Sequence, residues 1–117
     1  MAMEFDLVTL DAPDPRRLAD FWAAVLDLVV TEDEDDGRWI VLSSHEGQRR
    51  LGIQRGESRP GTVHLDLRCE RGAFDAAVER AVDLGATLLA PPRHEPYGAI
   101  ANLADPDGNP FDVCAYV

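Results

Sequence analysis

The chain has 117 residues, of which 45% are hydrophobic, and its formal net charge is −11. This length predicts one domain with a real core, and the apolar content excludes a disordered protein. The acidic balance argues against nucleic acid and anionic membrane surfaces as partners, and no apolar run approaches the ~20 residues of a membrane span. All basic residues are Arg, which excludes chemistry that needs a Lys side chain.

The first half begins with a predicted strand that includes Val8-Thr9-Leu10-Asp11 and leads into an amphipathic helix. Asp14 is a suitable N-cap and Pro15 a suitable first helical residue. Apolar residues then recur at helical spacing: Leu18, Phe21, Trp22, Val25 and Leu26. Three strands are predicted next, at about Val29–Glu32, Trp39–Ser43 and Arg50–Gln54. The acidic run Glu32–Asp36 is interpreted as a solvated hairpin loop.

The second half repeats this pattern. Val63-His64-Leu65-Asp66 resembles the tetrapeptide that begins at Val8, 55 residues earlier. A helix follows in which Gly85 is the natural residue after the C-terminal cap. Three strands are predicted at about Thr87–Ala90, Ala99–Leu103 and Phe111–Tyr116, with a loop from Pro91 to Gly98. The prediction is a single domain, residues 1–117, with pseudo-repeat halves 4–56 and 61–117.

The resulting order is β-α-β-β-β, twice, which predicts an α+β fold with a curved mixed sheet. One helix covers only one face of each half's sheet, so the two open faces are expected to enclose a cup with the helices outside. The alternation of residues fits this arrangement: Leu65 and Leu67 alternate with the polar residues His64, Asp66 and Arg68. We therefore expect apolar side chains under the helix and mixed ones in the cup.

Residues 105–113, Asp-Pro-Asp-Gly-Asn-Pro-Phe-Asp-Val, join turn chemistry to a final strand. Pro106 and Gly108 suit a tight turn. Asp112 then alternates with Phe111 and Val113, so it faces away from the apolar side of the strand. A carboxylate in that position either is solvated or lines a pocket. The two cysteines, Cys69 and Cys114, lie in strand-like segments and are interpreted as buried small hydrophobes.

The duplicated order, together with this motif and the Val63–Asp66 tetrapeptide, resembles the vicinal oxygen chelate superfamily. The likeness is to its glyoxalase-like branch, related to glyoxalase I, bleomycin resistance proteins and extradiol dioxygenases. The resemblance implies four metal ligands in the cup, one from each of four strands. The third matches His64, the fourth matches Asp112 and the second falls near Gln54. The first falls near Leu7 or Thr9, neither of which is a credible ligand.

A divalent metal is therefore a candidate cofactor with an incomplete ligand set of Gln54, His64 and Asp112, because an amide oxygen is a poor zinc ligand. Asp11 or Asp66 could substitute for the missing ligand. We expect purified protein to carry less than stoichiometric divalent metal. We also expect His64 and Asp112 to face the same cavity.

Two interpretations remain open for each candidate catalytic residue. His64 is a metal ligand or general base, or else a hydrogen-bonded strand histidine. Asp112 is a ligand, an orienting group or a proton acceptor, or else the salt-bridge partner of an Arg such as Arg68. Candidate ligand-binding residues complete the set: Trp39, Gln54, Asp66 and Tyr97. Aromatic residues are ordinary in small-molecule pockets, and core or rim packing is the alternative for Trp39 and Tyr97.

The predicted function is a glyoxalase-like protein that receives a small organic molecule. One hypothesis is an enzyme, a metal-assisted lyase, isomerase, epimerase or dioxygenase. The alternative is a non-catalytic protein that sequesters a compound, as bleomycin resistance proteins do. The resemblance also implies a homodimer. A cytoplasmic location is expected, because Cys69 and Cys114 are interpreted as free residues and not as a disulfide. No export signal is predicted either, since the segment Met1–Glu4 lacks basic and apolar regions.

Overall fold

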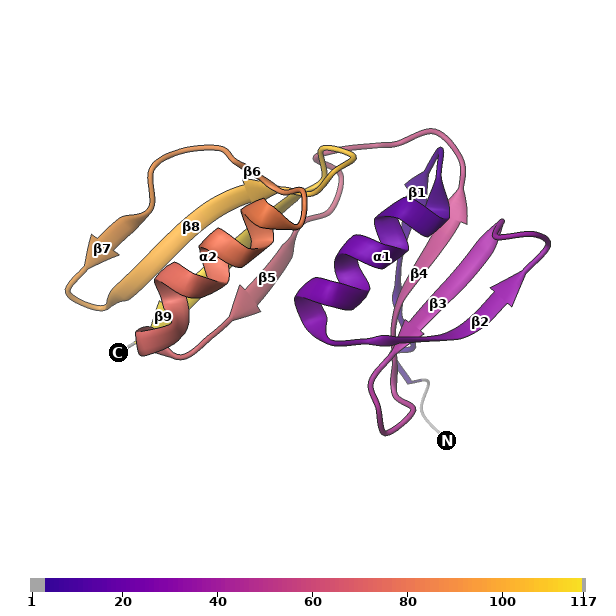
Figure 1. The fold of residues 1–117 in the computed structure, drawn as a ribbon, viewed down its shortest axis with the longest axis horizontal. Coiled ribbons are helices and arrows are strands. Elements are labelled where there is room, and N and C mark those ends of the chain that lie inside the picture. Colours follow the sequence, from indigo (N-terminus) through magenta and orange to yellow (C-terminus); the bar gives the residue numbers. More distant parts are fainter. Residues whose placement is uncertain (1–3, 117) are drawn as a thin grey trace. The chain divides into compact units, whose positions relative to one another are not determined.

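The computed structural model describes residues 4–116, and the chain divides between Ser58 and Arg59 into two compact units. Each unit has one α-helix packed on a mixed β-sheet, which confirms the predicted α+β class (Figure 1). Among the described residues, no helix is both long and apolar enough to cross a lipid bilayer. The boundary lies between the two predicted halves.

The first unit has the predicted order of elements: β1 (Val8–Ala12), α1 (Pro15–Leu26), β2 (Val29–Glu34), β3 (Trp39–Ser43) and β4 (Arg49–Arg55). The strands lie in the order β1-β4-β3-β2, with β1 parallel to β4 and the other pairs antiparallel. The helix stripe and the sheet residues beneath it form a core in which Leu18, Trp22, Ile40 and Ile53 are almost fully buried.

The second unit has the same order with one addition: β5 (Leu65–Arg68), a 3₁₀ turn η1 (Arg71–Ala73), α2 (Phe74–Asp83), β6 (Thr87–Leu88), β7 (Arg93–Glu95), β8 (Gly98–Ala104) and β9 (Pro110–Tyr116). The strands lie in the order β5-β9-β8-β6, and β7 pairs with the other end of β8. β5 and β9 are parallel, as β1 and β4 are.

Strand β7 corrects the predicted loop from Pro91 to Gly98. The chain that follows β6 stays hydrogen-bonded to β8 up to Leu89, whose amide donates to Asn102 O. Pro91 and Pro92 have no amide hydrogen and interrupt the ladder, and pairing resumes at Arg93. Edge strands tolerate such prolines, so these residues divide one long strand into β6 and β7 instead of making a loop.

Helix α1 begins, and helix α2 ends, where the sequence signals predict. The Asp14 carboxylate accepts a hydrogen bond from Arg17 N at 3.3 Å, and Pro15 starts α1. Beyond α2, Gly85 N donates to Val82 O and Ala86 N donates to Ala81 O. These two bonds form a Schellman motif, which needs the positive φ of 123° that Gly85 adopts.

The two cysteines are free thiols in different surroundings. Cys114 is buried, as predicted, but Cys69 is only half-buried. The difference follows from their places in the sheet. Cys114 lies in β9, between β5 and β8, whereas Cys69 comes directly after the edge strand β5.

Candidate functional site

A row of three polar residues crosses the second sheet. Asp66 on β5 is in register with Asp112 on β9, and Asp112 is in register with Asn102 on β8. The neighbouring row contains Phe111 and Leu103, which are both 0% exposed. Because side chains alternate along a strand, the polar row lies on the opposite face of the sheet from this buried row, and α2 covers the buried row (Figure 1).

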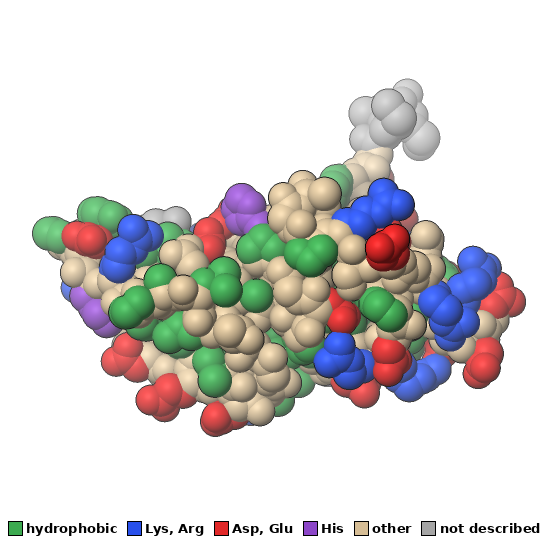
Figure 2. Space-filling view, turned by 90° about the horizontal axis from the view of Figure 1, so that it is seen from above, with side chains coloured by type: hydrophobic (Ala, Val, Ile, Leu, Met, Phe, Trp, Pro, Cys, Tyr) green, Lys and Arg blue, Asp and Glu red, His purple; other side chains and the backbone are tan. Residues whose placement is uncertain are grey.

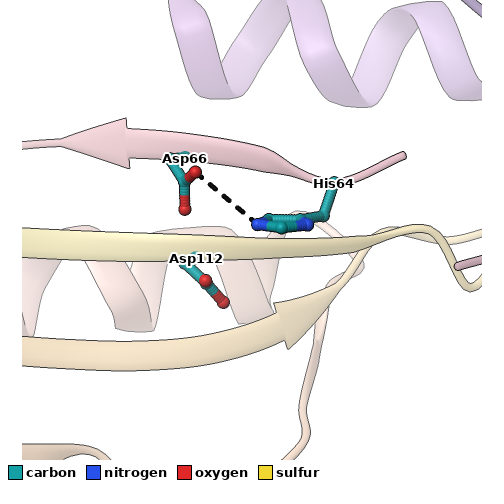
Figure 3. A group of neighbouring side chains, drawn as sticks. All are labelled: His64, Asp66 and Asp112. Atoms are coloured by element: carbon teal, nitrogen blue, oxygen red, sulfur yellow. Dashed lines mark ion pairs between the residues drawn. The ribbon is translucent and has the colours of Figure 1, made fainter. Parts of the chain in front are cut away.

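His64 immediately precedes β5 and joins the polar row (Figure 3). Its Nε2 atom lies 3.6 Å from Asp66 Oδ2. One ligand atom each from His64, Asp66 and Asp112 lie within 4.8 Å of one another. The structure therefore brings together the two predicted catalytic residues and Asp66, which the sequence offered as a substitute ligand.

Asn102 holds the third member of this group in place. Its Nδ2 atom donates to Asp112 Oδ1 at 2.6 Å. That bond occupies one carboxylate oxygen and leaves Asp112 Oδ2 for another partner. Sequence reasoning missed Asn102, although it has a visible signal: it is the sole polar side chain in β8, whose sequence is GAIANLA.

The group combines an imidazole with two carboxylates. The side chains of His64 and Asp66 are 56% and 69% exposed, so solvent screens their attraction, and Asp112 is half-buried. With His64 neutral, the three side chains offer two formal negative charges. Imidazole nitrogen and carboxylate oxygen are ordinary ligands of divalent transition metals, at about 2.0–2.2 Å.

The donor set fits such an ion. Two atoms that bind one ion at about 2.1 Å can be no more than about 4.2 Å apart. The separation of 3.6 Å between His64 and Asp66 already satisfies this limit. The separations within the whole group, all below 4.8 Å, need only small rotations of exposed side chains.

The first unit contains the corresponding row without the histidine. Asp11 on β1 is in register with Gln54 on β4, and Gln54 is in register with Trp39 on β3. This is the arrangement of Asp66, Asp112 and Asn102 in the second unit, and it places an amide where Asp112 stands. The residue 55 positions before His64 is Thr9, so this row has one carboxylate and no imidazole.

The remaining candidate residues belong to other elements of the chain. Half-buried Trp39 and exposed Gln54 belong to the first unit, where the Trp39 ring lies against Gly52. Tyr97 is 66% exposed in the turn between β7 and β8. It is five residues along the strand from Asn102, a distance of about 16 Å at ~3.3 Å per residue. Tyr97 is thus not part of the His64 group.

Comparisons with known proteins agree with this architecture. The family model for the glyoxalase-like domain matches residues 7–114. A glyoxalase/bleomycin resistance protein/dioxygenase family enzyme from Burkholderia phytofirmans PsJN is similar in structure, with a TM-score of 0.82 and 19% identity over 98% of this chain and 100% of that chain. No curated protein matches the chain by sequence.

Two fosfomycin resistance proteins named FosX are also similar in structure. The protein from Mesorhizobium loti has a TM-score of 0.76 and 18% identity, over 100% of this chain and 94% of that chain. A mutant of the protein from Listeria monocytogenes, in complex with Mn(II) and 1S,2S-dihydroxypropylphosphonic acid, has a TM-score of 0.79 and 18% identity, over 100% and 93%. Identities this low show a shared fold, whereas the family model covers almost the whole sequence. The chain belongs to the glyoxalase-like domain family.

Proposed function

We propose that this chain binds a small organic molecule at the open face of the second sheet, beside a divalent cation held by His64, Asp66 and Asp112. The observation that carries the proposal is the approach of these three side chains, whose ligand atoms lie within 4.8 Å of one another. Asp66 changes the expectation of an incomplete set, because it adds a second carboxylate. A bound divalent ion would supply a Lewis acid for oxygen atoms of the organic molecule.

Each residue has a distinct part in this proposal. Asp112 is fixed in rotation by its 2.6 Å hydrogen bond from Asn102, so its second oxygen is already oriented. His64 and Asp66 are exposed and adjust to the ion. The three side chains leave coordination positions of the ion free for the organic molecule. Catalytic metal sites keep such open positions, whereas structural metal sites are closed by protein ligands. With an ion bound, the class of reaction is that of a lyase, an isomerase or a dioxygenase.

A metal-free sequestering protein is the second candidate function. The observation that favours it lies in the first unit, where the expected ligand positions are occupied by Leu7, Thr9 and Gln54. None of these is a strong ligand for a divalent cation. In this case the organic molecule binds without an ion, and His64 acts as a hydrogen-bonding group.

Binding of Mn²⁺ to chelator-treated protein tests the first proposal, with the electron paramagnetic resonance signal of free Mn²⁺ as the readout. We expect one ion per chain, and His64→Ala and Asp66→Asn should each lower the affinity for Mn²⁺ by at least about tenfold. Loss of a group that only hydrogen-bonds to a metal ligand already has an effect of this size, so loss of a ligand has at least that effect. Asp27→Asn is the matched control, since Asp27 is an exposed carboxylate 3.1 Å from another histidine, His45. Equal losses in all three variants would contradict a specific site.

A thermal-shift screen of small phosphonates, carboxylates and thiols then separates the two functions, because a ligand that binds only the folded state raises its apparent stability. Stabilisation that requires Mn²⁺ supports the metal-dependent function. A ligand that stabilises the protein equally in excess chelator supports sequestration instead.

A further inference from the structure

The second unit has a groove on the face of its sheet opposite the His64 group. The groove has a volume of about 450 Å³ and lies between α2, the edge strand β6 and Pro92. Leu88 of β6 lines it and is in register with Leu103, a member of the buried row under α2. Because this row faces away from Asp66 and Asp112, the groove is separated from the proposed metal site by the sheet itself.

Carboxylates form one wall of the groove and apolar side chains form the rest. Asp75, Glu79 and Asp83 are spaced by four residues, so they form a line along α2. Val78 is buried beside them, while Val82 and Leu88 are 42% and 38% exposed. No lining residue is basic. In Figure 2, acidic side chains follow one edge of this unit next to hydrophobic ones.

Two of these carboxylates have no ion-pair or hydrogen-bond partner within residues 4–116. They are Glu79 and Asp83. Asp75 has His94 at 3.9 Å, and both of those side chains are largely exposed. The groove therefore presents uncompensated negative charge beside exposed hydrocarbon.

The folding of α2 does not explain this line of charge. Like charges spaced by four residues repel on a helix, and Asp83 lies at the C-terminal end, where the helix dipole disfavours an anion. The corresponding positions of the first half, 55 residues earlier, are Asp20, Ala24 and Leu28. The repeated architecture thus forms without such a line, and its presence on α2 lowers the stability of that helix.

We propose that this groove binds a small organic cation with an apolar body, its charged group against Glu79 and Asp83 and its hydrocarbon against Val82 and Leu88. The volume lies in the range of about 300–1,000 Å³ that is usual for small-molecule sites. Charge complementarity selects a cation, and the exposed apolar side chains select a molecule with a hydrocarbon portion. This site is independent of the metal proposal.

Three probes with the same eight-carbon alkyl chain test the proposal: octylguanidinium, octanol and nonanoate. Amide chemical shifts of isotopically labelled full-length protein report where each one binds. We expect octylguanidinium to saturate a site that includes Val78, Val82 and Leu88, and octanol to bind more weakly at the same residues. Nonanoate should bind at least about tenfold more weakly than the cation, because the two carboxylates of the groove attract the cation and repel the anion. Equal binding of cation and anion would overturn the proposal, as would shifts confined to the strands around Asn102.

The double variant Glu79→Gln/Asp83→Asn tests the role of charge. Its affinity for octylguanidinium should fall by about threefold for each charge removed, while octanol binding stays unchanged. Its melting temperature should rise by about 2 °C, because repulsion within α2 is relieved. The control is Glu57→Gln/Glu70→Gln, which removes two exposed charges elsewhere. If the control weakens cation binding as much as the groove variant does, the effect is one of net charge and the proposal fails.

Discussion

Asn102 donates a hydrogen bond of 2.6 Å to Asp112 from the neighbouring antiparallel strand. The two residues are directly opposite in the β8–β9 ladder, so the backbone pairing alone brings their side chains within reach of one another. The Asn102 carboxamide has no role in the core, because its face is the open one. Its effect is to select one orientation of the Asp112 carboxylate.

Asn102→Ala should therefore weaken Mn²⁺ binding while the three proposed ligands remain. We expect a loss of about tenfold, at the lower end of what removal of an outer-shell partner costs a metal site. The measurement is the Mn²⁺ titration of the proposed site, with the unfolding midpoint as a check on stability. Unchanged affinity in a stable variant would mean that Asp112 needs no positioning or takes no part in binding.

The sequence predicts those features that depend on residues close to one another in the chain. Asp14 begins α1 and Gly85 ends α2 because each acts on backbone groups within a few residues of itself. The alternation around Asp112 likewise placed this carboxylate correctly on the face opposite Phe111. The resemblance to a known family added the pairing of His64 with Asp112.

Features that depend on how one strand pairs with its neighbour were missed, because a strand's own residues do not specify that pairing. Strand β7 forms because Arg93 to Glu95 pair with β8. Their own sequence of Arg, His and Glu has no strand periodicity. Asn102 acquires its role only through the register of β8 with β9. The expected homodimer, the cytoplasmic location and the cup between the two open faces stay predictions.

Asp105→Ala should destabilise the turn before β9. Asp105 is 3% exposed, and its carboxylate accepts hydrogen bonds from Asp107 N, Asn109 N and Asn109 Nδ2. Alanine leaves these donors without their acceptor in a buried place, which costs about 2–4 kcal/mol of unfolding free energy. Urea unfolding followed by circular dichroism measures the change.

Asp105→Asn is the matched variant, because it keeps one oxygen for the backbone amides but loses the second. We expect about half of the loss caused by alanine. If both variants unfold at the wild-type midpoint, the hydrogen bonds of this turn contribute nothing to stability, and the prediction is wrong.

Gly52→Ala should disturb the packing of Trp39 on the open face of the first sheet. A Cβ atom at Gly52 would lie 2.4 Å from Trp39 Cη2 and 3.1 Å from Thr9 Oγ1. The ring must move, at a cost of about 1–3 kcal/mol for overpacking. Gly72→Ala is the control, since nothing lies within 4 Å of its Cβ position. Urea unfolding should show a loss for Gly52→Ala alone, and tryptophan emission should shift to longer wavelength as the ring becomes exposed.

Cys69 should react slowly with iodoacetamide at neutral pH. Burial raises the pKa of its thiol above the ordinary value, and the neighbouring Cys114 raises it further. Since only the thiolate is nucleophilic, the alkylation rate of the folded protein should rise with pH at higher values than that of the protein unfolded in urea. A Cys114→Ala variant leaves one thiol to observe, and burial, the larger cause, still acts in it.

The same shift has a consequence for stability. The folded state holds the Cys69 proton more tightly than the unfolded chain does. The contribution of Cys69 to the free energy of unfolding is therefore fully present below the pKa of this thiol in the unfolded chain, and it is lost as pH rises through its pKa in the folded protein. Cys69→Ala removes the thiol, and its unfolding midpoint should therefore fall less than that of the Cys114→Ala protein across this alkaline window. A Cys69 that alkylates with the pH profile of the unfolded chain would show instead that solvent reaches its sulfur freely beside β5.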